Sequence, residues 1–405
     1  VMDQLRQQKR VTQPIWLPPL PEATTLDTVA GEPRPTNSGL RIHSSALLRF
    51  PVGIIDDPAH QWQDTWELDL LASGGHIQIT GGPGSGKTTL LRTITASLAL
   101  THSPSLVSVY VLDLLGSALL SLRDLVNVGG VAVRADREVV RRTLEEVRGL
   151  LNQRELLLQQ HRADSLASLR TTLEDPSVNL AEIVLLIDGY GQLAEEFDDL
   201  AEIVFDLLRR GAAHGIHIVA TTTRWNEIRM AQQSFFGNKI ELRLSDPLES
   251  THGRNLAETL PSDRPGRALL AGGLFAHVAL PRVDGVASDD DAAEGLRRLS
   301  EAVSTGVAER AAEVRLLPPD LSPEGVKLPR GKALVALGLD ESDLSTTVLD
   351  MDGTDRHLIV LGDSGTGRTT MLRRVIAELV RTHSPKELVF AVFDPRRSLT
   401  GVVPE

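Results

Sequence analysis

The sequence predicts an α/β fold with a doubly wound, mostly parallel sheet, and three observations support this prediction. Short runs rich in Val, Ile and Leu alternate with helical stretches from residue 51 onward. A glycine-rich loop at residues 81–88 follows one such run and leads directly into a helical stretch. The same order of apolar run, glycine-rich loop and helix returns from residue 357. Strand–helix alternation with a glycine-rich loop after an early strand is typical of this fold class.

The second glycine-rich loop belongs to an internal repeat. Residues 81–88 read Gly-Gly-Pro-Gly-Ser-Gly-Lys-Thr, and residues 362–369 read Gly-Asp-Ser-Gly-Thr-Gly-Arg-Thr. Lys87 matches Arg368, the Thr-His-Ser-Pro at 101 returns at 382, and Asp113 matches Asp394, each at an offset of 281 residues. One constant offset for three landmarks indicates a tandem duplication. We therefore expect one complete domain and a second copy that is truncated at residue 405.

The chain is expected to have four segments. Residues 1–50 are rich in proline and predict an extended lead-in that docks on a domain surface. Residues 51–312 form the complete domain, residues 313–332 a linker, and residues 333–405 the N-terminal part of the second copy. The leucines of Leu316-Leu-Pro-Pro319 are expected to pack into an apolar groove, since leaving them in water is unfavourable; a mobile spacer is the alternative.

The complete domain shows strand and helix patterns in alternation. Most of the strand patterns are continuous apolar runs, which is typical of a parallel sheet that is buried on both faces. Strands are expected at residues 76–80, 107–113, 183–188, 216–222, 239–244 and 275–280, and helices at residues 86–100, 135–162 and 197–212. Residues 284–310 are expected to form one more amphipathic helix after an acidic turn.

Composition restricts the possible functions. The formal net charge is −12 and aromatic residues make up 3% of the chain, so neither a basic footprint nor many stacking platforms favour a nucleic-acid partner. The absence of cysteine excludes disulfides and thiolate zinc sites. No run of eighteen apolar residues predicts a membrane-spanning helix. Because the chain begins with Val1, we expect a fragment of a longer protein whose membrane anchor lies outside it.

The loop at residues 81–88 matches a complete phosphate-binding loop, or Walker A motif. Its glycines let backbone N–H groups converge on phosphates at a helix N-terminus, Lys87 supplies a cation, and the Thr88 hydroxyl is a ligand for Mg²⁺. These features predict ATP and Mg²⁺ as cofactors. The expected ATP-binding residues are Gly82, Pro83, Gly84, Ser85, Gly86, Lys87, Thr88 and Thr89.

Asp188 is the expected magnesium partner of Thr88, because it ends the apolar run Ile183-Val-Leu-Leu-Ile187. Additional-strand P-loop ATPases generally place a Glu after this Asp to polarise the attacking water, but here the next residue is Gly189. A missing base lowers the rate by a factor on the order of 10²–10⁴. We therefore expect this degenerate Walker B motif to allow ATP binding with slow or no hydrolysis, and Gly189→Glu to raise the rate. Glu195 and Glu196 lie too far along the chain to replace the missing carboxylate locally.

Several other residues are candidates for smaller roles. Thr222 or Thr223 is expected to sense the γ-phosphate at the strand tip, with backbone hydrogen bonding as the alternative. Asp113 is expected to be a structural cap, and His214 and His217 to be packed side chains. Arginines that either reach a neighbouring nucleotide or form surface salt bridges are Arg209, Arg210, Arg224 and Arg267.

Two further sequence features carry a resemblance to a known family. Arg210-Gly211 is followed by His214-Gly-Ile-His-Ile218 and a Thr-x-Arg strand tip, which resembles the FtsK/SpoIIIE superfamily of hexameric motor ATPases. Asp188-Gly-Tyr190 in place of Asp-Glu is similar to the second ATPase domain of the type VII (ESX) secretion ATPases, the EccC family. Other stretches with this similarity are Trp16-Leu-Pro-Pro-Leu20, Thr223-Arg-Trp-Asn-Glu-Ile-Arg229, Gly237-Asn-Lys-Ile-Glu-Leu-Arg-Leu244, Arg264-Pro-Gly-Arg-Ala268 and Asp394-Pro-Arg-Arg-Ser-Leu399.

The resemblance implies a role in protein export. It implies an additional-strand, RecA/FtsK-like fold, three tandem ATPase domains, and a place at the cytoplasmic face of the plasma membrane. It also implies neighbouring ATPase domains and other membrane components of the secretion complex as partners. Helical-hairpin (WXG100-type) proteins would be the substrates, bound mainly by the third domain. In that family the second and third domains are thought to bind ATP tightly and to regulate the first.

The second loop departs from the family pattern, which has lysine where this chain has Arg368. Arginine keeps the charge but is longer and planar, so phosphate would bind in an altered pose. The residues of this degenerate loop are Gly362, Gly365, Thr366, Gly367, Arg368, Thr369 and Thr370.

Three functions remain open at this stage. The first is a regulatory nucleotide-binding module of a protein-secretion motor, and the second is an FtsK-like DNA translocase. The third is a P-loop scaffold with a purely structural nucleotide. The acidic charge and Gly189 favour the first or the third, so no nucleic-acid partner is expected.

Overall fold

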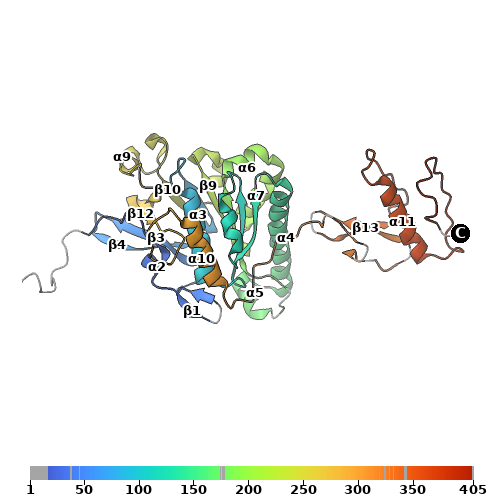
Figure 1. Cartoon of the computed structure of the whole chain (residues 1–405), viewed down its shortest axis with the longest axis horizontal. Helices are drawn as coiled ribbons and strands as arrows, with labels where there is room; N and C mark the ends of the chain where they lie inside the picture. Colours follow the sequence, from blue (N-terminus) through green and yellow to red (C-terminus); the bar gives the residue numbers. More distant parts are fainter. Residues whose placement is uncertain are drawn as a thin grey trace, which may run out of the picture. The chain divides into compact units, whose positions relative to one another are not determined.

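The computed structural model describes residues 17–403, apart from residues 37–38, 45, 174, 176–177, 319, 323–324, 328, 332 and 342–343. The chain divides into two compact units, Val1–Val314 and Arg315–Glu405, which are described separately (Figure 1). Among the described residues, no helix is both long enough and apolar enough to cross a membrane.

A ten-stranded mixed sheet forms the centre of the first unit. Its strand order is β4-β3-β12-β11-β10-β5-β9-β8-β6-β7. The six strands from β10 to β7 run parallel, whereas β4, β3, β12 and β11 extend the sheet by antiparallel pairing. The mostly parallel sheet that the sequence predicts is thus confirmed. The strands are β3 (Arg49–Asp57), β4 (Trp62–Asp69), β5 (Ile77–Thr80), β6 (Val107–Asp113), β7 (Val128–Val133), β8 (Glu182–Asp188), β9 (Ile216–Thr222), β10 (Asn238–Leu242), β11 (Arg267–Leu270) and β12 (Leu274–Val278).

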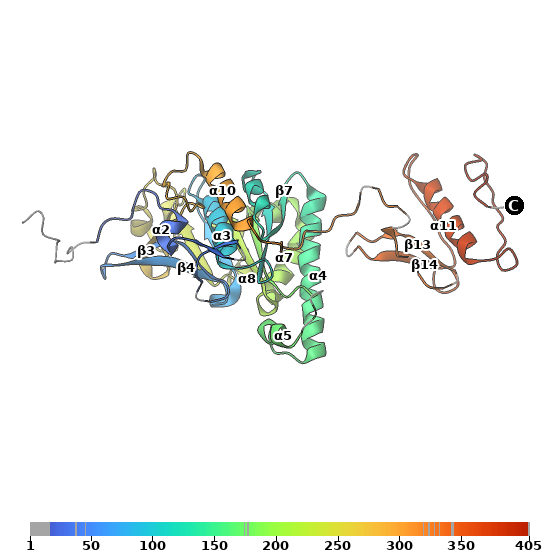
Figure 2. The same ribbon diagram turned by 60° about the horizontal axis from the view of Figure 1, so that its bottom comes forward.

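Helices cover both faces of this sheet (Figures 1 and 2). Helices α3 (Lys87–Thr101) and α10 (Ala292–Ser304) belong to one apolar cluster, and α4 (Arg137–His161) and α7 (Asp198–Arg210) belong to the other. Strand β8 contributes Val184 and Leu186 to the first cluster and its alternate residues to the second, so it is buried on both faces. Shorter helices are α5 (Leu166–Thr172), α6 (Tyr190–Glu196), α8 (Met230–Gln233) and α9 (Arg254–Ala257).

Four strands of the sheet, β3, β4, β7 and β11, are not predicted from the sequence. Strand β4 alternates exposed and buried residues as part of an antiparallel hairpin with β3 at the sheet edge, so it lacks the apolar run of a parallel strand. Strand β11 has only four residues. Strand β7 contains Gly129 and Gly130, which are typical of turns.

The glycines of β7 make room for a segment that covers this edge of the sheet. A Cβ atom on Gly129 would lie 2.3 Å from the Ala312 carbonyl oxygen. The Ala311 N–H donates to Val126 O at 2.8 Å, and the Tyr110 hydroxyl donates to Ala312 O at 2.8 Å. Residues 310–314 therefore blunt the exposed edge of β7, as proteins commonly do with edge strands. Leu316 is 45% exposed within the second unit, and the packing that the sequence predicts for it against the preceding domain stays a prediction.

The proline-rich lead-in docks on the first unit. Arg267 donates to Leu20 O at 2.9 Å and to Pro21 O at 2.6 Å. The segment is not uniformly extended, since it contains helix α2 (Leu26–Ala30) and a hairpin of β1 (Arg34–Thr36) and β2 (Gly39–Arg41). Residues 1–16, including Trp16, lie outside the described residues.

The second unit contains a hairpin of β13 (Leu334–Leu339) and β14 (Thr346–Asp350), followed by helix α11 (Arg368–Thr382). Residues 357–361, for which the sequence predicts a strand, are not in a strand, and Ile359 and Leu361 are 81% and 87% exposed. The reason is physical: an apolar run becomes a strand only when neighbours satisfy its backbone groups, and no described strand pairs with this one.

Candidate nucleotide site

The candidate site lies at the carboxyl edge of the parallel strands. The Walker A loop follows β5, which lies between β10 and β9, and Asp188 ends β8 on the far side of β9. Helix α3 begins at Lys87, so the last two residues of this loop form the first turn of the helix. Binding sites of open α/β sheets are found at this edge, where loops and helix N-termini converge.

Two glycines give the Walker A loop its shape. Gly84 and Gly86 have φ angles of +69° and +104°, in the region that favours glycine. A Cβ on Gly86 would also lie 2.7 Å from the backbone nitrogen of Gly266, whose N–H donates to Ser85 O at 2.8 Å. The buried Ser85 hydroxyl has no hydrogen-bond partner among the described residues. A buried polar atom without a partner in this loop fits a site shaped for a ligand.

Lys87 is folded onto its own loop. Its ammonium group donates to Gly81 O at 2.5 Å and to Gly82 O at 2.9 Å, and the residue is only 8% exposed. Burial lowers the pKa of Lys87, while the charges of Asp188 and Glu227 oppose that shift. This cation is therefore held within the loop, at the position where phosphate groups would need it.

Asp188 and Thr88 meet as the sequence predicts. The Thr88 hydroxyl donates to Asp188 Oδ2 at 3.0 Å, and Asp188 is 1% exposed. Burial raises the pKa of Asp188, against hydrogen bonds from Thr221 and Thr88 that lower it. A carboxylate and a hydroxyl at this distance are oxygen ligands of the kind that Mg²⁺ takes beside a bound phosphate, so the residues fit the expected metal.

Thr221 completes this arrangement, although no sequence motif singles it out. Its hydroxyl donates to Asp188 Oδ1 at 2.5 Å and accepts from the Gly189 N–H at 2.9 Å. It thereby joins the ends of β8 and β9. The only signal in the sequence is a polar residue near the end of an apolar strand, and three consecutive threonines share it.

The two threonines predicted as γ-phosphate sensors have different surroundings. Thr222 is 1% exposed and shares a hydrogen bond of 2.8 Å with the Thr80 hydroxyl. The Thr223 N–H donates to the Glu227 carboxylate at 3.1 Å. Both threonines line a cavity of about 100 Å³ that Lys87 also lines. They are therefore placed beside the Walker A cation, with Thr222 already engaged by a neighbouring strand.

Gly189 is constrained to be glycine by its backbone and its surroundings. Its φ angle is +91°, and a Cβ there would lie 2.7 Å from two carbon atoms of Leu115. A glutamate at this position would need a left-handed backbone and a displaced leucine. The structure consequently does not favour a gain of hydrolysis by Gly189→Glu, because the new side chain would strain the backbone and displace Leu115.

Two other carboxylates line the same cavity. Glu195, near the end of α6, and Glu227, in the loop after β9, are both among its lining residues. Sequence distance from Gly189 is thus a poor guide to Glu195, since α6 folds back beside the cavity. Glu196 instead pairs with Arg134.

The four arginine-finger candidates differ in their exposure and in their partners. Arg267 is 8% exposed and holds the lead-in through Leu20 and Pro21, which contradicts a role as a free finger. Arg209 and Arg210 end α7 and both pair with Asp206. Arg224 is different, because its side chain is 62% exposed next to the tip of β9, with Glu249 at 3.6 Å.

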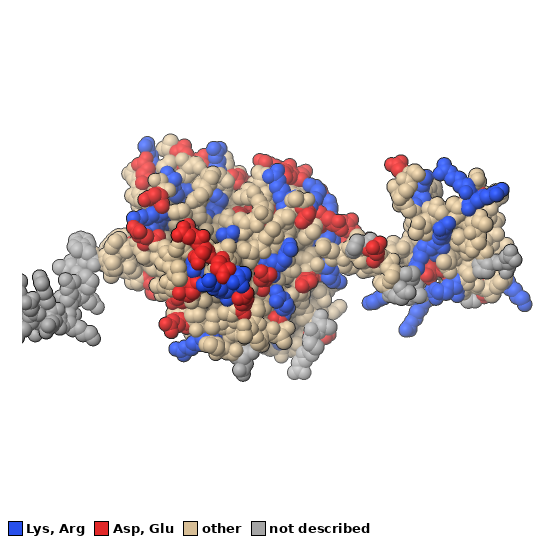
Figure 3. Space-filling model, in the orientation of Figure 1, with Lys and Arg blue, Asp and Glu red and all other residues tan. Residues whose placement is uncertain are grey.

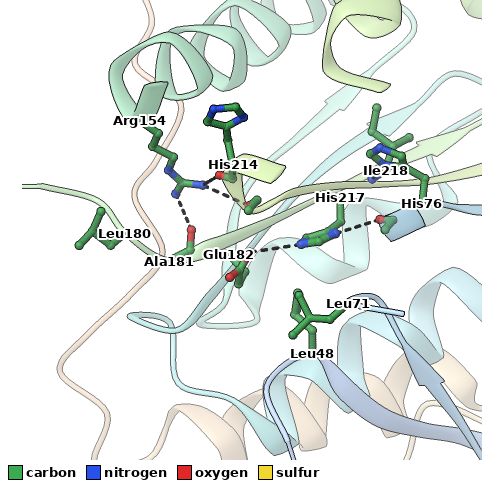
Figure 4. Close-up of polar contacts among 12 residues, drawn as sticks. Leu48, Leu71, His76, Arg154, Leu180, Ala181, Glu182, His214, His217 and Ile218 are labelled. Atoms are coloured by element: carbon green, nitrogen blue, oxygen red, sulfur yellow. Dashed lines mark hydrogen bonds and ion pairs between the residues drawn. The ribbon is translucent and has the colours of Figure 1, made fainter. Parts of the chain in front are cut away.

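Asp113 acts as the predicted cap, and the histidines are packed as predicted. Asp113 accepts from the Gly116 N–H at 3.0 Å and the Leu119 N–H at 2.8 Å. His217 is buried where β9 begins, with one ring nitrogen 2.9 Å from Gly75 O and the other 3.2 Å from Glu182 (Figure 4). His214 contacts Arg210 O at 2.8 Å. Both histidines lie at the amino-terminal edge of the sheet, away from the Walker A loop.

The second loop has the backbone form of the first but not its buried cation. Gly362 and Thr366 are related as Gly81 and Ser85 are, since a Cβ on either glycine would lie 2.5 Å from the partner's hydroxyl oxygen. Gly367 has a φ of +92° and precedes α11 as Gly86 precedes α3. Arg368, however, is exposed where Lys87 is buried.

A larger cavity of about 470 Å³ lies on the other side of the Walker A loop. Gly86 and Thr89 form part of its wall, together with residues 263–266, Glu22 of the lead-in and Ser288. The docked lead-in therefore contributes to a cavity that opens beside the start of α3.

Comparison with known proteins agrees with this geometry. The profile of the FtsK/SpoIIIE family matches residues 41–284 and 317–402. The chain is 34% identical over 418 residues to the ESX-1 secretion system protein EccCb1 of Mycolicibacterium smegmatis, covering 100% of this chain and 69% of that protein. It is 35% identical over 408 residues to the ESX secretion system protein EccC of Thermomonospora curvata, covering 96% of this chain and 30% of that protein.

Solved structures show the same relationship. ATPases 2 and 3 of Thermomonospora curvata EccC, in complex with a signal sequence peptide, align with a TM-score of 0.83 at 35% identity, covering 92% of this chain and 68% of that one. The cytoplasmic domain of the same type VII secretion ATPase aligns with a TM-score of 0.86 at 34% identity, covering 95% of this chain and 45% of that one. The chain therefore belongs to the FtsK/SpoIIIE family of P-loop ATPases and has the EccC and EccCb1 proteins of ESX secretion systems as relatives.

Proposed function

We propose that this chain is the regulatory, nucleotide-binding part of an ESX secretion motor. The site at residues 81–88 binds Mg·ATP tightly and hydrolyses it slowly. Lys87 and the loop N–H groups would hold the phosphates, and Thr88 and Asp188 would hold Mg²⁺, which supplies charge neutralisation at the phosphates. The cavity of about 470 Å³ beside Gly86 and Thr89 is suited to the nucleoside.

The observation that carries the proposal is an intact cation and metal site beside Gly189, where a carboxylate side chain would require a left-handed backbone and a displaced Leu115. Thr88 and Asp188 lie 3.0 Å apart, and Lys87 is held within the loop. The Cβ direction of Gly189 is filled by Leu115. The groups that would bind phosphate and Mg²⁺ are therefore present, while position 189 lacks the usual base. This combination favours tight binding of ATP with slow turnover.

The partners follow from the relatives. The Thermomonospora curvata structure contains ATPases 2 and 3 with a signal sequence peptide. By similarity, we propose that the present chain works beside neighbouring ATPase domains and other membrane components of the secretion complex. WXG100-type proteins would be the exported substrates, bound mainly by the third domain, at the cytoplasmic face of the membrane.

A DNA translocase of the same family is the alternative function. The formal net charge of −12 argues against it. On the face drawn in Figure 3, acidic and basic side chains are mixed over the first unit, without the continuous basic surface that binds a phosphate backbone.

Nucleotide retention and turnover test the proposal together. Purified chain should bind Mg·ATP and turn it over below about 1 s⁻¹, the lower end of the usual enzyme range. Lys87→Ala should abolish binding, because it removes the only cation of the loop, and duplex DNA should leave the rate unchanged. Turnover well above 1 s⁻¹ would contradict the regulatory role, and stimulation by DNA with binding at physiological salt would favour the translocase.

A further inference from the structure

The cavity beside Gly189 already contains the kind of group that position 189 lacks. Its volume of about 100 Å³ is enough for several water molecules. Lys87, Gly189, Thr222 and Thr223 line it, and so do the carboxylates of Glu195 and Glu227. One of these two glutamates is therefore a candidate for the water-polarising role.

Glu227 is the fixed carboxylate of the two. Both of its oxygens accept from the Thr223 N–H at 3.1 Å, and Oε1 also accepts from the Arg224 N–H at 3.1 Å. Its side chain lies across Gly191, where a Cβ would be 2.9 Å from Oε2. A carboxylate has about four acceptor sites, so capacity remains for a water. Glu195, by contrast, is exposed, and Gln192 contacts it at 3.5 Å.

The loop that carries Glu227 is anchored at several points. The Trp225 indole N–H donates to Glu241 at 3.2 Å, and Glu241 is fully buried. Gln233 donates to Ile228 O at 2.9 Å, and the Ile228 side chain is fully buried. Groups held in this way are preorganised, which is what positioning of a reactant requires.

Topology places Glu227 between the two parts of the nucleotide site. Strand β9, whose tip leads into this loop, lies between β5 with the Walker A loop and β8 with Asp188. Glu227 and Lys87 line the same cavity, which Gly189 also lines. A carboxylate from the loop after β9 thus reaches the region that a residue at 189 would otherwise serve.

We propose that Glu227 is the catalytic base of the slow hydrolysis at this site and partly replaces the carboxylate missing at position 189. In the step it supports, the water oxygen forms a bond to the γ-phosphorus, and the bond from that phosphorus to the β,γ-bridging oxygen breaks. ADP leaves with the bridging oxygen, and the proton of the water passes to Glu227. This inference rests on the proposed binding of Mg·ATP at residues 81–88.

The test compares Glu227→Gln with Glu195→Gln in the full chain. The glutamine at 227 can still accept one backbone hydrogen bond but cannot take a proton. We expect its dissociation constant for Mg·ATP, measured by calorimetry, to stay within about threefold of wild type. Single-turnover cleavage of radiolabelled ATP should fall on the order of 10²–10⁴-fold, the usual contribution of a general base. Glu195→Gln should lower cleavage far less than Glu227→Gln does, and Glu227→Asp should retain more cleavage than Glu227→Gln.

The remaining outcomes would overturn either the role of Glu227 or the proposed binding of Mg·ATP. Cleavage by Glu227→Gln at the wild-type rate, or wild-type chain that keeps its bound ATP intact for days, overturns the proposal. Loss of ATP binding or of folding in Glu227→Gln also overturns it, because Glu227 would then only hold the strand tip. Failure of wild-type chain to bind Mg·ATP, or full binding by Lys87→Ala, would instead remove the proposed function itself.

Discussion

At the scale of single residues, Asp188 depends on two hydroxyl groups for its orientation. Thr221 donates to one carboxylate oxygen and Thr88 to the other. Thr221→Val would leave Asp188 Oδ1 and the Gly189 N–H without this partner in a buried site. We expect a loss of about 1–3 kcal/mol in the free energy of unfolding, measured by urea denaturation, because unpaired buried polar groups are unfavourable by this amount. Thr223→Val is the matched control and should change it little; an equal loss in both variants would contradict the account.

His76 makes stability depend on pH. Burial lowers the pKa of His76 to about 4, with the charge of His217 acting in the same direction and a hydrogen bond to Leu208 opposing it. Between this value and an ordinary pKa of about 6.5, the unfolded chain binds a proton that the folded chain does not. The contribution of His76 to the free energy of unfolding is therefore fully present above about pH 6.5. It is lost as the pH falls toward 4, by at most about 1.36 kcal/mol per pH unit.

The corresponding measurement is urea unfolding at pH 5 and at pH 7.5. Wild type should lose more stability on acidification than His76→Gln does, since the variant cannot titrate at this position. His277, whose pKa burial also lowers to about 4, should preserve part of the slope in both proteins. His161→Gln, at the end of α4, serves as the control. Identical pH slopes in wild type and His76→Gln would show that His76 does not contribute.

The residues of the site could be predicted from sequence where the chemistry is local. Lys87 and Thr88 belong to one contiguous motif, and Asp188 ends an apolar run that only a buried strand explains. Thr221 and Glu227 could not be predicted in this way, because their roles depend on β9 lying between β5 and β8. Sheet order is a property of long-range pairing, and it decides which strand tips meet.

At the scale of elements, a glycine inside a helix and a glycine in the Walker A loop have opposite effects on stability. Gly149 lies inside α4 with open space around its Cβ position, whereas Gly86 has a φ of +104° and faces Gly266. Gly149→Ala should therefore raise the free energy of unfolding by about 0.5–1 kcal/mol through helix propensity. Gly86→Ala should lower it, and thermal melts of both variants check the pair. A lower melting temperature for Gly149→Ala would contradict the account of α4.

Element prediction succeeded where strands are buried on both faces and failed at the margins of the sheet. Strands β6, β8 and β9 are continuous apolar runs, and their predicted bounds agree with the structure to within a residue. Strand β7 is not predicted because it contains Gly129 and Gly130. The absence of side chains at these glycines leaves room for residues 310–314. Within residues 284–310 the helix spans Ala292–Ser304, after the acidic turn that Arg282 binds through Asp284 and Asp291.

At the scale of the whole molecule, the duplication repeats the loop without repeating the site. Helices α3 and α11 each have 15 residues and start at equivalent positions. Arg368 is nevertheless exposed, while Lys87 is buried against its loop. One complete nucleotide site per chain is the central claim that follows.

The number of nucleotides bound per chain tests this claim most directly. Equilibrium dialysis of purified chain against Mg·ATP should give one nucleotide per chain in wild type, one in Arg368→Ala and none in Lys87→Ala. This pattern is expected because Lys87 is held within its loop, and the next residue, Thr88, contacts Asp188. Arg368 is exposed. Two nucleotides per wild-type chain, or one retained by Lys87→Ala, would contradict the account.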